Sequence, residues 1–349
     1  MTFISLCPTA DDRRDQAMTP LAIRNMMWEP LPKGGVKASE WALVNWPGLV
    51  KRYSGSVASR CRGLYTQPGV QSGALFAVFG NTFYRVASDY TFTNLGTIPG
   101  GENVQWGYLR DDLLILGGGE LFVYDGAGLT QVSDVDFPSD AYTLTMLDQR
   151  AIVTVSGADQ YYWSDVLSGT SWGALSFATS ERRPDQINAS GALGGDLWLF
   201  GSKGIEVLAG GGDASAPFST LRSVDINKGC GSRDSLVLIQ SSFFFVSDDR
   251  SVYRTNGYAI TQLSHRPLER RLQVMSDLEL SRCVGFSVQF GSRLFYILRL
   301  TNHNAFCYDI FGDTWTELST WERDAYKIGF TVNAYGKTFC TGTSGGAPF

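Results

Sequence analysis

The sequence repeats one local pattern along most of its length: an apolar strand, a turn of Gly, Asn or Asp, and a second strand rich in Tyr, Phe and Val. Such units are typical of β-hairpins. Six of them follow residue 72: "LFAVFGNTFYRV" at Leu75, "LLILGGGELFVYDG" at Leu113, "AIVTVSGADQYYWSD" at Ala151, "DLWLFGSKGIEVL" at Asp196, "FFFVSDDRSVYRTNG" at Phe243 and "LFYILRLTNHNAFCYDI" at Leu294.

The spacing of these hairpins predicts a β-propeller. Equivalent second-strand positions are 39, 40, 44, 47 and 55 residues apart, measured at Phe83, Phe122, Tyr162, Glu206, Tyr253 and Tyr308. Propeller blades repeat about every 40 to 50 residues, and packing in a ring buries both faces of each sheet. A stack of β-sandwiches is the alternative, but sandwiches do not require a hairpin every ~40 residues. We therefore expect an all-β propeller of about six blades, six or seven, over residues 73–349.

Two regions break the β pattern. Residues 1–72 are rich in Pro, Gly and Trp, which indicates an irregular N-terminal arm that docks onto a partner and supplies a closing strand. Trp28, Trp41 and Trp46 are its candidate contacts with another subunit or an adaptor, and core packing is the alternative for each.

A short inserted helix is expected near residues 265–277. Pro267 fits a first helical turn, and Leu268, Leu272 and Met275 share one face. The charged residues of this segment point outward, either into solvent or against a neighbouring subunit, and they are Glu269, Arg270 and Arg271.

Composition narrows the functional class. Of 349 residues, 44% are hydrophobic, and 39 glycines against 12 prolines favour many tight turns. The net charge of -5 disfavours sequence-specific DNA binding, because the field of the molecule repels phosphates. The six cysteines show no metal-binding spacing and are expected to be buried free thiols. We expect a soluble protein synthesised in the cytoplasm, with no signal peptide, membrane segment, metal or cofactor.

A turn motif occurs twice, as "YYWSDVLSGTSWGAL" from Tyr161 and "CYDIFGDTWTEL" from Cys307. It resembles the aspartate box of sialidase-like propellers and, more loosely, the corner of kelch repeats. Such turns are structural: the carboxylate caps backbone N–H groups and the tryptophan packs between strands, which assigns these roles to Asp165, Trp172, Asp309 and Trp315. A glycosidase also needs two carboxylates at a fixed separation, and no pair stands out by spacing. We therefore expect no enzyme and propose no catalytic residue.

The central part of the chain resembles the packaged-DNA stabilisation proteins, the tail hub or nozzle family of short-tailed bacteriophages. The resemblance rests on the order of LWLFG, IEV, a GDA-x-x-PF loop, a Gly-Cys pair and VYR-x-NGY between residues 195 and 264. Earlier pieces agree, namely "NMMWEP" at Asn25, "WPGL" at Trp46, "RCRGLY" at Arg60 and "NLGTIPG" at Asn94. Members of this family generally extend beyond the length of this chain.

The resemblance implies a structural protein of the virion tail. It implies a hexameric ring below the head-to-tail adaptor and portal, to which a tail needle or fibres attach, with double-stranded DNA passing through its channel without sequence-specific binding. An acidic subunit suits such a channel wall, since it repels the sliding genome. A propeller that binds or cleaves glycans is the alternative, and a kelch-like scaffold is a third, which uneven blade lengths disfavour.

Overall fold

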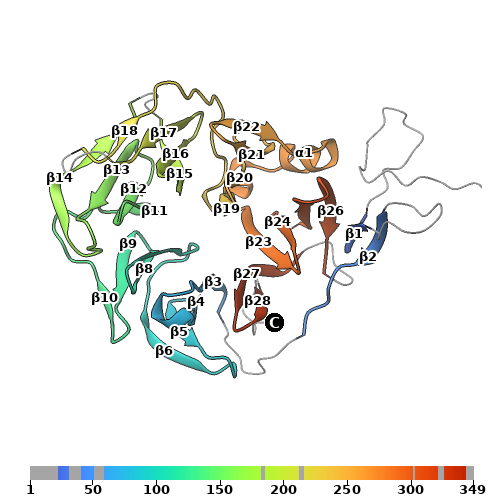
Figure 1. Ribbon diagram of the computed structural model, residues 1–349, viewed down its shortest axis with the longest axis horizontal. Helices are drawn as coiled ribbons and strands as arrows, with labels where there is room; N and C mark the ends of the chain where they lie inside the picture. The colour runs from blue at the N-terminus through green and yellow to red at the C-terminus, as the bar shows by residue number, and fades with distance from the viewer. Residues whose placement is uncertain are drawn as a thin grey trace, which may run out of the picture.

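The computed structural model describes residues 23–30, 41–50, 59–181, 185–211, 216–301, 303–320 and 326–342. Six four-stranded antiparallel sheets follow one another around a ring, as blades 1 to 6 of a β-propeller (Figure 1). Blade 1 comprises β3 (Cys61–Tyr65), β4 (Leu75–Phe79), β5 (Thr82–Val86) and β6 (Phe92–Thr97). Blade 2 comprises β7 (Gln105–Leu109), β8 (Asp112–Gly117), β9 (Glu120–Tyr124) and β10 (Leu129–Gln131). Blade 3 comprises β11 (Ala141–Leu147), β12 (Arg150–Val155), β13 (Gln160–Ser164) and β14 (Trp172–Thr179).

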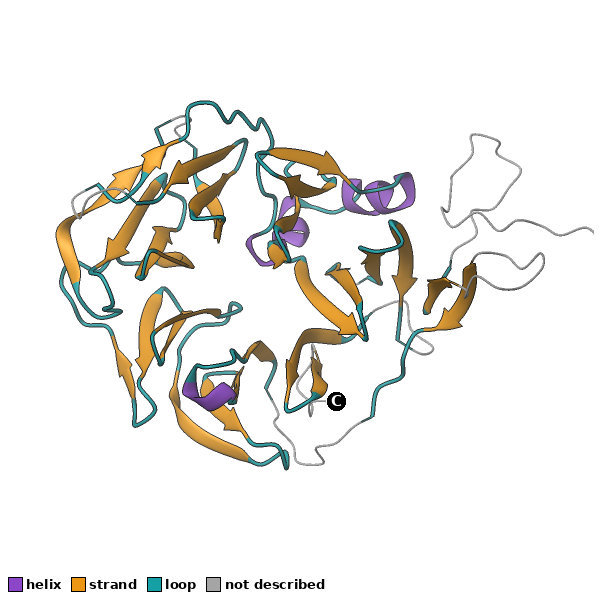
Figure 2. Ribbon diagram, in the orientation of Figure 1, coloured by secondary structure: helices purple, strands orange, loops and turns teal. Residues whose placement is uncertain are grey.

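Blades 4 to 6 have the same order of strands, and the predicted propeller of about six blades is confirmed. Blade 4 comprises β15 (Ile187–Leu193), β16 (Asp196–Gly201), β17 (Ile205–Ala209) and β18 (Ser219–Thr220). Blade 5 comprises β19 (Val237–Ile239), β20 (Ser242–Val246), β21 (Val252–Asn256) and β22 (Ala259–Gln262). Blade 6 comprises β23 (Val284–Phe290), β24 (Arg293–Arg299), β25 (Ala305–Asp309) and β26 (Thr314–Leu318). Strands dominate the whole ring (Figure 2).

A two-stranded sheet closes the ring between blade 6 and blade 1. This closing hairpin consists of β27 (Ile328–Ala334) and β28 (Lys337–Gly342), and it packs against both neighbours. The Tyr335 hydroxyl accepts a hydrogen bond from the backbone N–H of Leu75 at 3.1 Å and donates one to the carbonyl of Val86 at 2.8 Å. A single side chain therefore joins the closing hairpin to two strands of blade 1.

The core of the propeller is divided among the gaps between sheets. Successive residues of a strand point to opposite faces, so each central strand supplies side chains to two gaps. The described residues form seven apolar clusters, one in each gap between neighbouring sheets. In order around the ring, from the gap between blades 1 and 2 to the gap between the closing hairpin and blade 1, one pair from each cluster is Phe83 and Ile115, Leu116 and Leu144, Ile152 and Leu197, Phe200 and Phe245, Phe244 and Tyr296, Phe295 and Ile328, and Phe79 and Phe339.

The expected helical insertion lies between blades 5 and 6 and forms two short helices, α1 (Arg266–Gln273) and α2 (Asp277–Ser281). Leu268, Leu272 and Met275 are buried in the apolar cluster between these blades, as the sequence predicted. Ser276 begins α2 with a capping box, in which its hydroxyl accepts from the Glu279 N–H and the Glu279 carboxylate accepts in return.

The N-terminal arm differs from the expectation in two ways. β3 precedes the boundary that we placed between residues 72 and 73, so blade 1 already begins at Cys61. Among its described residues, 23–30 and 41–50, the arm supplies no strand to the ring closure. Its hairpin, β1 (Met26–Pro30) and β2 (Trp41–Asn45), lies on the outer edge of blade 6 (Figure 1), where Asn25 N donates to Glu317 O at 2.8 Å. The sequence analysis assigned the closing strand to the arm, whereas the closing hairpin lies at the other end of the chain.

The cysteines of the described chain are buried free thiols, as predicted, and they are Cys61, Cys230, Cys283, Cys307 and Cys340. Burial raises the pKa of Cys230 and of Cys283 to about 12, which keeps both thiols protonated and unreactive. Cys7 lies outside the described residues. None of the helices described is long and apolar enough to cross a membrane.

Replacing Tyr335 by Phe tests the ring closure. The change removes a donor and an acceptor that join the closing hairpin to blade 1, so we expect the free energy of unfolding to fall by about 1 to 3 kcal/mol in urea titrations. Tyr258→Phe is the matched control, because that side chain is 53% exposed and its hydroxyl donates to the Asp196 carboxylate in the neighbouring blade. Equal losses in the two variants would contradict a special role for the closure.

Candidate functional site

The two predicted turn motifs occupy the same place in their blades. Both connect the third strand to the fourth, β13 to β14 in blade 3 and β25 to β26 in blade 6. In blade 6, the buried Asp309 accepts from the Phe311 N–H at 3.0 Å and also pairs with Arg293. The Trp315 indole N–H donates to the Leu263 carbonyl at 2.7 Å. The side chains of this motif are therefore engaged in holding the blade.

The turn in blade 3 reaches the same result through different contacts. Asp165 accepts from the Ser171 hydroxyl at 2.6 Å, and the buried Trp172 packs edge-on against Phe137 at 5.0 Å. The backbone N–H of Trp172 is capped by Asp134, an acceptor that the motif did not identify. This bond and one from the N–H of Asp136 lower the pKa of Asp134.

Two of the three candidate tryptophans of the arm, Trp28 and Trp46, pack within their own subunit. Trp28 is buried, with 2% of its surface exposed, and Trp46 packs edge-on against Phe290 and Phe295 at 5.1 and 5.2 Å. Trp41 is the first residue of β2 and pairs with Pro30. Because the rings of Trp28 and Trp46 are used inside the chain, they hold the arm on blade 6 and offer little surface to a neighbour.

The predicted charged residues lie on the surface of α1. Arg270 and Arg271 are exposed and Glu269 is partly buried, with Arg271 3.9 Å from Glu317 and Glu269 accepting from the Ser264 hydroxyl at 2.8 Å. The structure thus brings together α1, blade 6 and the start of the arm, because Arg24 also pairs with Glu317 at 3.4 Å.

A group of hydrogen-bonded polar residues lies where the inner ends of the blades meet, and we name it the axial cluster: Arg60, Asn103, Tyr142, Arg233 and Asp234. Arg233 donates to the carbonyls of Tyr142 and Asn103, both at 3.0 Å, and to the Asp234 carboxylate at 2.9 Å. Asn103 donates to Asp234 at 2.7 Å and accepts from Arg60. The guanidinium also lies 4.7 Å from the centre of the Tyr142 ring.

These contacts cross the centre of the ring. Arg233 and Asp234 belong to a 3-10 turn that precedes blade 5, whereas Asn103 lies in the link from blade 1 to blade 2 and Tyr142 in β11 of blade 3. Blades 2 and 5 face each other across the propeller (Figure 1), so hydrogen-bonded side chains bridge the middle of the subunit.

The electrostatics of the axial cluster favour the charged pair. Burial lowers the pKa of Arg233, but the neighbouring Asp234 outweighs it, and the pKa is raised overall. Arg299, nearby, has a pKa lowered to about 10 by burial and by the like charge of Arg60. The sequence analysis missed this cluster because Asn103 and Tyr142 lie 130 and 91 residues from Arg233, so no local spacing marks it.

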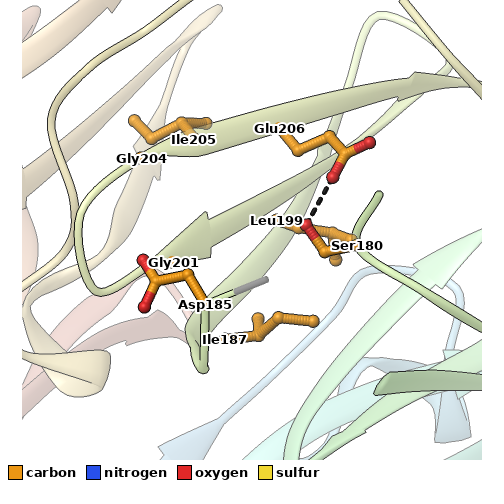
Figure 3. Close-up of a pocket in the computed structure, with 8 residues that line it drawn as sticks. All are labelled: Ser180, Asp185, Ile187, Leu199, Gly201, Gly204, Ile205 and Glu206. Carbon is orange, nitrogen blue, oxygen red and sulfur yellow. Dashed lines mark hydrogen bonds between the residues drawn. The ribbon is translucent and has the colours of Figure 1, made fainter. Parts of the chain in front are cut away.

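Two cavities lined by described residues are poor candidates for a substrate site. One small space beside blade 4 holds the buried Glu206, which accepts from Ser180 (Figure 3) and from Thr220 at 2.8 Å. Its volume is about 10 Å³, enough for about one water molecule. A wider groove of about 360 Å³ lies between the loop before β4 and the turn of the closing hairpin, and no carboxylate, histidine or cysteine lines it.

Among the described residues, no three His, Cys, Asp or Glu side chains come together to hold a metal ion. The described fold is a six-bladed propeller closed by a two-stranded hairpin, and the axial cluster joins segments of several blades. The chain belongs to the family described as "Bacteriophage P22 Gp10, beta-propeller", which it matches over residues 12–346. No curated protein sequence is significantly similar to it.

Solved structures share the propeller fold at low identity. The extracellular domain of the putative hybrid two-component system BT4673 from B. thetaiotaomicron aligns with a TM-score of 0.56 and 10% identity, covering 86% of this chain and 39% of that one. PorZ of Porphyromonas gingivalis aligns at 0.50 and 12%, covering 84% and 37%, and a streptogramin B lyase at 0.53 and 10%, covering 82% and 92%. This chain spans about two-fifths of the first two proteins, and the likeness shows the fold alone.

Breaking the axial cluster should cost stability. In Arg233→Met, the Asp234 carboxylate loses its charged partner in a largely buried setting, and we expect the free energy of unfolding to fall by about 3 to 5 kcal/mol. Lys203→Met is the control, since Lys203 pairs with Asp248 but is 71% exposed, so its loss should be at most about 1 kcal/mol. Comparable urea midpoints for the two variants would show that the cluster contributes little.

His265 gives a pH dependence to the folded state. Its ring stacks on Trp315 at 5.9 Å, and burial lowers its pKa below the ordinary 6.5. The unfolded chain therefore binds the proton more readily, so the free energy of unfolding should decrease as the pH falls below about 6.5. In urea titrations at about pH 7 and about pH 5.5, above the range of ordinary carboxyl groups, the wild type should lose more stability than His265→Gln. An equal loss in both would rule out this histidine as the cause.

Proposed function

We propose that this chain is a structural protein of the virion tail, which forms the hub or nozzle below the head-to-tail adaptor. The observation that carries the proposal is membership of the phage P22 Gp10 propeller family over residues 12–346. In this role the protein is made in the cytoplasm of the host and assembles as a hexameric ring against the portal and adaptor. A tail needle or fibres would attach to the same ring.

The axial cluster supports one detail of this proposal, the position of the DNA channel. The major groove of B-DNA alone is about 12 Å wide, so a duplex cannot pass through a propeller whose centre is bridged by hydrogen-bonded side chains. The channel therefore lies between subunits, enclosed by a ring of propellers. Retention of the packaged genome and its later ejection would both occur along that shared axis.

The charge of the chain supports the same role. At -5, with 34 acidic residues against 29 lysines and arginines, the subunit repels phosphates, so DNA slides past without being held. The protein acts on the genome as a wall and needs no catalytic group. The geometry favours this role over a glycan-cleaving propeller, because Asp309 and Asp165 are engaged in their turns and the groove between blade 1 and the closing hairpin carries no carboxylate.

Electron microscopy of single particles, with the protein alone and mixed with a portal and adaptor complex, tests the proposal. We expect a sixfold ring with an axial channel, and duplex DNA at physiological salt should bind more weakly than about 10⁻⁴ M. A monomer that does not bind the adaptor, together with hydrolysis of host polysaccharide, would replace this proposal by the glycan-cleaving alternative.

A further inference from the structure

Charge is unevenly distributed around the propeller. Blades 2 and 3, residues 105–179, contain ten aspartates and glutamates against two arginines and no lysine, although the whole chain has 34 acidic and 29 basic residues. Across the ring, α1 carries Arg266, Arg270 and Arg271 against the single Glu269. An acidic sector and a basic helix thus lie on different sides of one molecule.

The acidic sector exposes apolar side chains along β14, the outer strand of blade 3. Leu175 is 86% exposed and Phe177 is 43% exposed. The Asp134 bond to the N–H of Trp172 places the loop with Val135, which is 94% exposed, beside the start of β14. We name this surface the blade 3 patch, and it consists of Val135, Val166, Leu175 and Phe177 with the acidic residues Asp136, Asp159 and Asp165.

Acidic residues lie at both ends of the apolar strand. Asp165 precedes the start of β14, where its N–H donates to the carbonyl of Ser171 at 2.9 Å. Asp159 lies at the other end, where its carbonyl accepts from the N–H of Ser180 at 2.8 Å. An apolar centre with a charged rim is the usual anatomy of a protein–protein contact surface.

The outer face of α1 carries the opposite charge, while α2 beside it carries the acidic residues Asp277 and Glu279. Leu268 and Leu272 bury one face of α1, and residues on its other face are exposed, among them Arg266 and Arg270. Val274 at the end of α1 is 80% exposed, and Leu278 in α2 is 60% exposed. We name this surface the helical patch: Arg266, Arg270, Val274 and Leu278.

We propose that the blade 3 patch of one subunit binds the helical patch of the next, and that this contact builds the ring. The inference rests on the proposed function and names the two surfaces that the ring requires. A second copy of this chain is the partner because the two patches match each other in both respects: each has exposed aliphatic side chains, and their charges are opposite.

The position of the patches on the propeller fits a closed assembly. They are different surfaces, so their contact is heterologous, and repeated heterologous contacts close into a ring when each subunit turns by the same angle. Blades 4 and 5 separate the patches along the shorter way around the propeller (Figure 1), so the neighbours on the two sides of a subunit do not lie opposite each other. A chain of such subunits curves.

Charge reversal on each patch separately tests the contact. The first variant is Arg266→Glu with Arg270→Glu, and the second is Asp136→Lys with Asp159→Lys. In each variant, like charges meet at every contact between copies, so we expect ring formation to need at least about a tenfold higher protein concentration. Ring formation is followed by native mass spectrometry and single-particle electron microscopy, and unchanged thermal unfolding midpoints show that both variants fold.

Mixing the two variants gives the decisive result. Wherever a reversed helical patch meets a reversed blade 3 patch, opposite charges meet again, and the remaining contacts are those of the wild type. An alternating ring with an even number of subunits should therefore form from two proteins that do not assemble alone. A mass difference between the two chains identifies the alternating ring.

The control and the contrary outcomes separate this inference from the proposed function. Arg85→Glu with Arg110→Glu removes two exposed arginines outside both patches and should leave the ring intact. If the wild type forms rings and the two patch variants form them equally well, or their mixture does not restore assembly, other surfaces build the ring and only this inference is overturned. A wild-type chain that stays monomeric with the adaptor present overturns both.

Discussion

The structure depends on one constraint, that a four-stranded sheet with two apolar faces must be covered on both sides. Each blade meets this requirement by packing against its neighbours, so the hydrophobic core that the structure describes consists of seven separate clusters arranged in a circle. No blade is stable by itself in this scheme, because its second apolar face is exposed to water until the next sheet covers it. Blades 1 and 6 would each expose one apolar face to water if the closing hairpin were absent, so this small sheet stabilises both ends of the ring.

Closure in turn defines what the centre can be used for. Inner strands converge on the axis, and the axial cluster bridges the space between them with an ion pair, an amide and a tyrosine ring that lies against the Arg233 guanidinium. A buried ion pair is weak evidence for stability, but this one joins segments of blades 1 to 3 and 5 and therefore fixes how they face each other. In the proposed role, a subunit with a bridged centre acts through its outer surface, where it contacts other copies.

Much of the fold follows from the sequence because hairpins are local. Alternating apolar residues around turns such as Gly80–Asn81 identify the strands, and their spacing counts the blades. The buried face of α1 was equally predictable, since Leu268 and Leu272 stand at helical spacing. Ring closure, the place of the arm and the axial cluster were not, because they depend on contacts such as Tyr335 to Leu75 and Arg233 to Asn103, in which no local pattern relates the partners. Asp134 was missed for the same reason.

The closing hairpin also imposes an order of events on synthesis. Leu75 and Tyr335 are 260 residues apart, so blade 1 leaves the ribosome long before the sheet that covers it. At about 5 to 20 residues per second, the interval is roughly 10 to 50 seconds. Throughout that time the growing chain is an open arc with an uncovered apolar face at its first blade, and contacts of such long range also slow folding afterwards. The nascent subunit therefore passes through a period in which this apolar face is accessible to chaperones and the propeller is not yet closed.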